Sequence, residues 1–76
     1  MSRLEKRSLT LRGHRTSVTL EPEFWAALRA LAAVEGRSVN ALAAEIDERR
    51  TLGGDGASLA SAIRVHLLAA AREGRC

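Results

Sequence analysis

Two stretches decide the fold of this 76-residue chain: Thr16-Ser17-Val18-Thr19-Leu20-Glu21-Pro22 and, about one helix length later, Gly36-Arg37-Ser38-Val39-Asn40. Polar and apolar residues alternate in the first stretch up to Leu20, which predicts a β-strand, and Pro22 suits the first turn of a helix. Glycine commonly ends helices and serine commonly caps them, so the second stretch predicts a turn between two helices. The strand cannot bury a face alone and therefore needs a partner.

The residues before that strand are also β-prone, but their apolar positions change parity. Leu9 and Leu11 are odd-numbered, whereas Val18 and Leu20 are even-numbered, and one straight strand cannot place all four on one face. We therefore expect a bulge, bend or turn at 13–14. We take 15–20 as the functional strand and 1–7 as a flexible arm. The segment 8–12 is either a second strand or an ordered arm. We identify no internal repeat.

Helical periodicity follows in three segments. Apolar residues recur at helical spacing after Pro22, after Ser38 and after Ser58, and serine is a good N-cap in both later cases. We expect the second helix to fade over 45–50 and a glycine-rich loop to span 51–57. The expected apolar positions of the three helices are Phe24, Trp25, Leu28 and Leu31; Val39, Leu42, Ala43 and Ile46; and Leu59, Ile63, Leu67 and Ala70.

The positive charge is concentrated near the N-terminus. Residues 1–20 hold five basic side chains and one acidic one, a net +4, while the other 56 residues hold seven basic and eight acidic ones, a net −1. A basic segment on a neutral body suits a phosphate-rich partner such as nucleic acid. A solvated basic tail is the alternative interpretation.

Composition excludes several classes of protein. The single cysteine, Cys76, allows no internal disulfide, and His14 and His66 lack partners at metal-ligand spacing, so we expect no metal site and no cofactor. No pattern unites a nucleophile with a base, which speaks against an enzyme. Without a long apolar run or a signal peptide, we expect a cytoplasmic protein. One small domain of this size is marginally stable alone, which favours oligomerisation.

These residues resemble the ribbon-helix-helix (MetJ/Arc-like) family of bacterial DNA-binding proteins. The resemblance lies in the 36–40 turn and the strand about 16 residues upstream. It is closer still to a subfamily of small proteins that share the motifs at 13–17 (Gly-His-Arg-Thr-Ser), 21–25 (Glu-Pro-Glu-Phe-Trp) and 61–64 (Ser-Ala-Ile-Arg). The core of the resemblance covers 13–50, and the subfamily likeness reaches about residue 68.

The resemblance implies a mostly α fold with one short strand per chain. Two chains would pair their strands into a two-stranded antiparallel ribbon, forming an intertwined homodimer, and each would add a C-terminal helix. The divisions are then 1–12 (arm or extra strand), 13–50 (ribbon-helix-helix core), 51–57 (loop) and 58–76 (C-terminal helix). The implied dimer core comprises Val18, Leu20, Phe24, Trp25, Leu28, Leu31, Val39, Leu42 and Ile46.

The resemblance also implies how DNA would be bound. A ribbon fits the major groove. If Val18 and Leu20 face the core, then Arg15, Ser17 and Thr19 face the bases. The start of the second helix would hold the DNA backbone. The implied phosphate contacts are Arg37, Ser38, Val39 and Asn40, together with Lys6, Arg7 and Arg12.

We therefore expect a sequence-preferring DNA-binding transcriptional regulator, a repressor, acting as a homodimer or as a tetramer on DNA. One alternative is an antitoxin whose loop and third helix wrap a toxin, although the regular apolar face of that helix resembles a packing element. The other alternative is a dimeric protein-interaction module that does not bind DNA. The 8–12 segment would support this second alternative if it covered the reading face.

Overall fold

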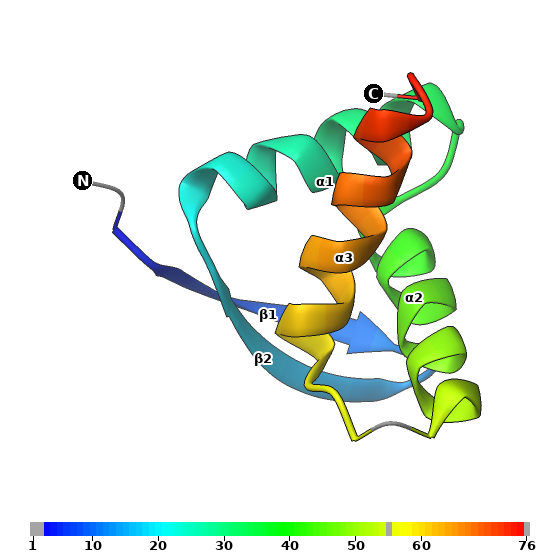
Figure 1. The fold of residues 1–76 in the computed structure, drawn as a ribbon. Coiled ribbons are helices and arrows are strands. Elements are labelled where there is room, and N and C mark those ends of the chain that lie inside the picture. Colours follow the sequence, from blue (N-terminus) through cyan, green and yellow to red (C-terminus); the bar gives the residue numbers. More distant parts are fainter. Residues whose placement is uncertain (1–2, 55, 76) are drawn as a thin grey trace.

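The computed structural model describes residues 3–54 and 56–75, so Cys76 lies outside the described residues. Three helices lie on one side of a two-stranded ribbon (Figure 1). Within the described ranges, no helix is long and apolar enough to cross a membrane. The elements in chain order are β1 (Glu5–Leu11), β2 (His14–Leu20), α1 (Pro22–Val34), α2 (Val39–Gly53) and α3 (Leu59–Arg72).

The two strands form an antiparallel hairpin within one chain. Ser8 lies opposite Ser17 at its centre, and the chain reverses through Arg12 and Gly13. Both turn residues have positive φ, 53° and 84°, as a two-residue type I′ turn requires. Glycine adopts this backbone conformation without strain, whereas arginine does so only rarely. The turn expected near Gly13 is therefore present, and the 8–12 segment is mainly strand.

The hairpin corrects two expectations. The chain contributes two strands, not one, and 5–7 is strand where a flexible arm was expected. The physical reason is the reversal at Arg12: opposed residues in an antiparallel pair share a face, so Leu9 and Leu11 reach the same side as Val18. The mostly α fold, the two-stranded antiparallel ribbon and the extra C-terminal helix are confirmed.

Caps define the helices where the sequence placed them. The N–H of Ala41 donates to the Ser38 hydroxyl over 3.0 Å, and Ser58 caps α3 in the same way through the N–H of Ser61 over 3.1 Å. Gly36, with a φ of 68°, ends the turn after α1. Helix α2 does not fade over 45–50 but continues to Gly53, so 51–53 is helical and not loop.

Ion pairs along α2 explain why it continues through its charged stretch. Arg49 contacts Glu45 over 3.2 Å, and Arg50 contacts Asp47 over 2.6 Å. Pairs of opposite charge spaced three or four residues apart stabilise a helix by about 0.2–0.5 kcal/mol each. The charged residues therefore support the helix they were expected to end.

One hydrophobic core fills the space between the ribbon and the helices. Helix α3 closes it with Ile63, Leu67 and Ala70, which are all buried. Seven of the nine residues assigned to a dimer core are buried within this single chain, and Phe24 and Val39 are partly buried against them. The seven buried side chains thus pack within one chain, whereas Phe24 and Val39 keep exposed surface, and the role of all nine in a dimer stays a prediction. The seven are Val18, Leu20, Trp25, Leu28, Leu31, Leu42 and Ile46.

Candidate nucleic-acid interface

The face of the ribbon that points away from the helices is polar. Because directly opposed residues share a face, the register places three pairs there, each with one member from each strand. All six residues are exposed except Thr19, which is half-buried. The residues expected to read bases thus lie together on the solvent side, and β1 adds three more. The pairs are Lys6–Thr19, Ser8–Ser17 and Thr10–Arg15.

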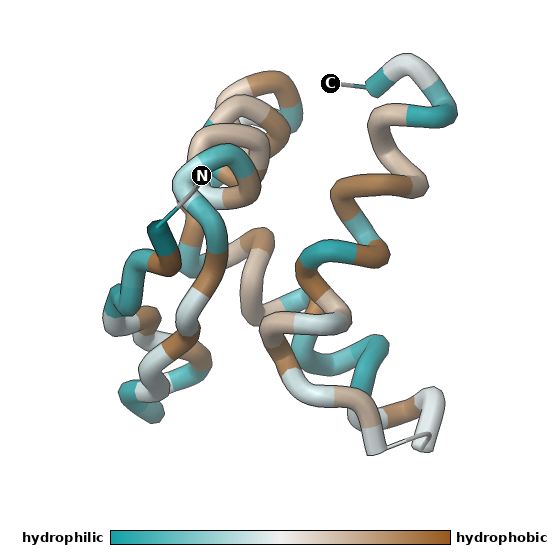
Figure 2. Tube along the Cα trace, turned by 60° about the vertical axis from the view of Figure 1, so that its left-hand side comes forward, coloured by the Kyte–Doolittle hydropathy of each residue, from teal (hydrophilic) through white to brown (hydrophobic). Residues whose placement is uncertain are grey.

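Alternation along each strand produces this face. Hydrophobic and hydrophilic residues follow each other along the hairpin (Figure 2), so that Leu9, Leu11, Val18 and Leu20 are buried while their neighbours are solvent-facing. Ser8 and Thr10 were missed, and Lys6 was assigned to phosphate, because the sequence left a bulge, a bend and a turn open at 13–14. A type I′ turn centred on Arg12 and Gly13 fixes the register of the whole hairpin.

The chemistry of this face matches the edges of DNA bases. Two cationic side chains lie at diagonally opposite corners, Lys6 on β1 and Arg15 on β2, and hydroxyl groups occupy the four other positions. Within the described residues, neither cation forms an ion pair. Arginine and lysine recognise guanine, and serine and threonine hydroxyls bond to several base edges.

Two other basic residues of the hairpin are already engaged. Arg7 shares its face with the core residues, lies 2.8 Å from the Glu5 carboxylate, and stacks over the Trp25 ring at 5.5 Å from its centroid. Arg12, in the turn, forms an ion pair with Glu48 of α2. Both side chains remain substantially exposed, so they lie beside the reading face without belonging to it.

The start of α2 lies against the outer edge of β1. The N–H of Thr10 donates to the side-chain oxygen of Asn40 over 3.3 Å, which fixes the helix end beside the ribbon. The Ser38 hydroxyl serves as the helix cap. In the part of the chain that the structure describes, the N–H groups of Val39 and Asn40 have no acceptor. Such groups at a helix N-terminus favour an anion.

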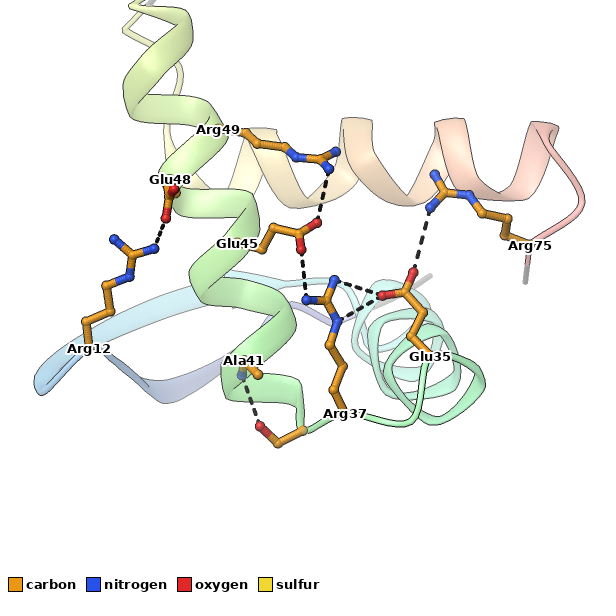
Figure 3. Close-up of polar contacts among 9 residues, drawn as sticks. Arg12, Glu35, Arg37, Ala41, Glu45, Glu48, Arg49 and Arg75 are labelled. Atoms are coloured by element: carbon orange, nitrogen blue, oxygen red, sulfur yellow. Dashed lines mark hydrogen bonds and ion pairs between the residues drawn. The ribbon is translucent and has the colours of Figure 1, made fainter.

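Arg37 has a different environment from the one expected of a phosphate contact. Its guanidinium lies 2.8 Å from the carboxylates of both Glu35 and Glu45 (Figure 3). The hydrogen bond to Glu45 raises the pKa of Arg37, and the same bond lowers the pKa of Glu45. The same carboxylates also contact Arg75 and Arg49, over 3.7 and 3.2 Å respectively. Arg37 thus joins the α1–α2 turn to α2, and its contact with phosphate stays a prediction.

A hollow of about 270 Å³ opens between β1 and the start of α2. Arg29 of α1 is exposed at this hollow and was missed from the sequence, although it follows Trp25 by one helical turn. Its charge and the free helix N–H groups give the hollow a positive character. The lining residues are Arg7, Ser8, Leu9, Trp25, Arg29, Ser38, Val39 and Asn40.

The two histidines are separate. His14 is exposed beside the hairpin turn, while Nε2 of His66 on α3 is buried without a hydrogen-bond partner. Burial lowers the pKa of His66, and Arg49 and Arg75 lower it further. Among the described residues, no group of three His, Cys, Asp or Glu side chains is placed to hold a metal ion.

Comparisons with known proteins agree with this architecture. The chain is similar to a solved structure of an uncharacterized protein from Bordetella pertussis Tohama I, with 37% identity and a TM-score of 0.76. The match covers 99% of this chain and 63% of that one, so this chain spans less than two thirds of the length of that relative. No curated protein matches the chain. The model of the ribbon-helix-helix domain matches residues 4–71. The chain therefore belongs to the ribbon-helix-helix domain family.

Proposed function

We propose that the protein is a sequence-preferring DNA-binding transcriptional regulator, a repressor, that inserts its ribbon into the major groove. The outward face of the hairpin carries this proposal: six polar side chains lie opposite an apolar face that is sealed by helices. The helices cover the apolar side of the ribbon, so its polar side is the one that is open to DNA.

The dimensions of the ribbon suit the major groove. Two paired strands lie about 4.8 Å apart, and the groove is about 12 Å wide. Arg15 would contact a guanine, with Ser17 and Thr19 bonding to neighbouring base edges. Each well-formed pair contributes roughly 1–3 kcal/mol of discrimination against the wrong base.

Contacts to the DNA backbone would come from the side of β1. The hollow beside α2 offers Arg29 and the free N–H groups of Val39 and Asn40 to a phosphate. Arg7 lies on the neighbouring strand and Arg12 lies in the turn, whereas Lys6 lies on the outward face, where it can reach a base edge. Affinity would arise largely from phosphate neutralisation and would fall steeply with salt. Occupation of a promoter by such a complex would block transcription.

The proposal still includes a homodimer, but one in which the two chains do not share a ribbon. Each chain contains a complete ribbon, so two copies would present two ribbons to two sites on DNA. The contact between copies would have to use surface outside the buried core. Tetramers on DNA would arise if such dimers occupied adjacent sites.

Fluorescence anisotropy with labelled duplexes tests the proposal. We expect the chain to bind random duplex at low salt and to bind a selected site more tightly. Arg15→Ala should relax base preference, whereas Arg29→Ala should weaken binding to all sequences alike. Arg72→Ala, which removes an exposed charge at the far end of α3, is the matched control. Absence of any binding at low salt would instead support a protein-interaction module.

The antitoxin alternative would assign the toxin contact to the segment after α2. Helix α3 packs on its own chain, with Ile63 and Leu67 buried and Arg64 bound to Glu21 over 3.0 Å. Segments that wrap a partner are commonly disordered until they bind it. The packing of α3 therefore favours the regulator, and co-purification of a small protein with the chain would favour the antitoxin.

A further inference from the structure

The two strands carry the same hexapeptide pattern. Residues 6–11 read Lys-Arg-Ser-Leu-Thr-Leu and residues 15–20 read Arg-Thr-Ser-Val-Thr-Leu. Serine, threonine and the final leucine are identical, and the lysine–arginine and leucine–valine exchanges preserve charge or apolar character. The chain therefore has an internal repeat, which corrects the expectation of none. It is easily missed because it is short and only three of six positions are identical.

The pairing register coincides with this repeat. Ser8 lies opposite Ser17, and the pairs on either side are Lys6–Thr19 and Thr10–Arg15. A rotation of 180° about the midpoint of the serine pair exchanges the strands. It places Lys6 on Arg15 and Thr10 on Thr19. The outward face thus has approximate two-fold symmetry within one chain.

Packing of the core explains the symmetry of the inner face of the ribbon but not that of the outward face. On the inner face, Leu9 corresponds to Val18 and Leu11 to Leu20, and all four are buried in the core. The outward side chains contact solvent, so packing does not require a cation, a serine and a threonine in the same order on both strands. A ligand with two-fold symmetry would require that order. Duplex DNA with a palindromic sequence has such symmetry, with its axis pointing into the groove.

We infer that one chain carries a complete, pseudo-two-fold-symmetric DNA reader, whose ligand is a short palindromic duplex element. Lys6 and Arg15 contact equivalent guanines on opposite strands. Arg15 lies opposite Thr10, which is four residues from Lys6 along β1. The two cations are therefore about 14 Å apart along the ribbon, which corresponds to roughly four base-pair steps. This inference rests on the proposed function and adds the symmetry of the site and the number of chains that read it.

In vitro selection followed by native mass spectrometry tests the stoichiometry. The selected core should be palindromic, and a duplex of about 12 base pairs, just over one helical turn, should bind one chain. A core without two-fold symmetry, or two chains on every such duplex, would overturn the inference while leaving DNA binding intact. Failure to bind any duplex would instead overturn the proposed function.

Matched variants test the equivalence of the strands. Lys6→Ala and Arg15→Ala should each weaken binding to the selected site by about tenfold. Each should relax base preference at one of two symmetry-related positions, while Arg72→Ala should leave both preferences unchanged. Circular dichroism confirms that each variant is folded. If Arg15→Ala changes base preference and Lys6→Ala does not, only β2 reads the bases and the inference fails.

Discussion

Strands β1 and β2 present matching side chains to solvent, but they are held in the fold in different ways. The edge of β1 is tied to the helices, because Asn40 accepts the N–H of Thr10 and Trp25 donates to the carbonyl of Glu5 over 2.9 Å. Strand β2 instead continues directly through Glu21 into α1. The outward faces are alike, whereas the attachments differ. The comparison separates residues that serve a ligand from residues that serve the fold.

The inner faces of the two strands also differ, at one pair of equivalent positions. Arg7 of β1 corresponds to Thr16 of β2, yet Arg7 is held by Glu5 and stacked over Trp25. Its charge is therefore used partly within the chain, while Lys6 and Arg15 make no ion pair among the described residues. Counting basic residues in the first 20 positions overestimates the charge available to DNA.

The largest expected effect is on the shared core. Leu20→Ala should lower the free energy of unfolding by about 2–5 kcal/mol, because it removes a fully buried side chain from a packed core. Leu11→Ala, at the equivalent position of β1, should cost less, since Leu11 is 7% exposed near the end of the ribbon. Urea denaturation measures both values. Equal losses would show that the two strands contribute equally to the core.

The next effect concerns the outward face. Lys6→Ala combined with Arg15→Ala should reduce the free energy of binding a selected site by the sum of the single losses, each about 1–3 kcal/mol. Additivity is expected because the two side chains contact separate bases. Anisotropy titrations at fixed salt measure this. A double variant no weaker than Arg15→Ala alone would mean that Lys6 reads nothing.

A smaller effect should distinguish the two strand edges. Asn40→Ala removes the acceptor for the N–H of Thr10 and should cost about 1 kcal/mol of stability. Amide hydrogen exchange should accelerate at Thr10, while the N–H of Val18 in β2, opposite Arg7 inside the hairpin, should keep its protection. Asn40→Asp, which keeps an acceptor at this position, is the control. Equal acceleration in both strands would indicate loss of the whole hairpin.

The sequence predicted most of the helical architecture. The serine caps, the proline start and the polar face of 15–20 all follow from local rules and are present in the structure. The resemblance placed the partner of β2 in a second chain, whereas the structure places it in the same chain. Alternation shows that a strand needs a partner without showing which segment supplies it. The two-residue turn was not recognised because arginine, here Arg12, is rarely found at positive φ.

Long-range contacts were the other missing information. Arg37 looked available to phosphate in sequence, but Glu45 lies eight residues away and reaches it only in the folded chain. Arg29 was overlooked because it becomes part of a basic hollow only when α1 packs beside β1 and α2. Neither contact has a signature in the spacing of residues.

The smallest expected effect is on pH dependence and involves the helices and not the ribbon. Burial lowers the pKa of His66 below its ordinary 6.5, with Arg49 and Arg75 acting in the same direction and Glu35 and Glu45 opposing them. The unfolded chain therefore binds the proton more readily. The stability contribution of neutral His66 is fully present above pH 6.5 and is lost as the pH falls through the lower folded-state pKa.

His66→Gln should flatten this part of the stability profile, measured by urea denaturation at a series of pH values. His14→Gln, at the exposed turn, is the matched control. The carboxylates of Glu21 and Glu45, whose pKa values are lowered from 4.5, lose their contribution only at more acidic pH. An unchanged profile between pH 5 and 7 in His66→Gln would contradict the assignment.

The most direct test is an NMR titration of the full chain with a selected duplex, following the backbone amides. Binding through the ribbon predicts the largest shift changes at Lys6, Ser8, Thr10, Arg15, Ser17 and Thr19, with comparable changes in both strands. Shift changes confined to the helices, with the hairpin amides unmoved, would contradict the account.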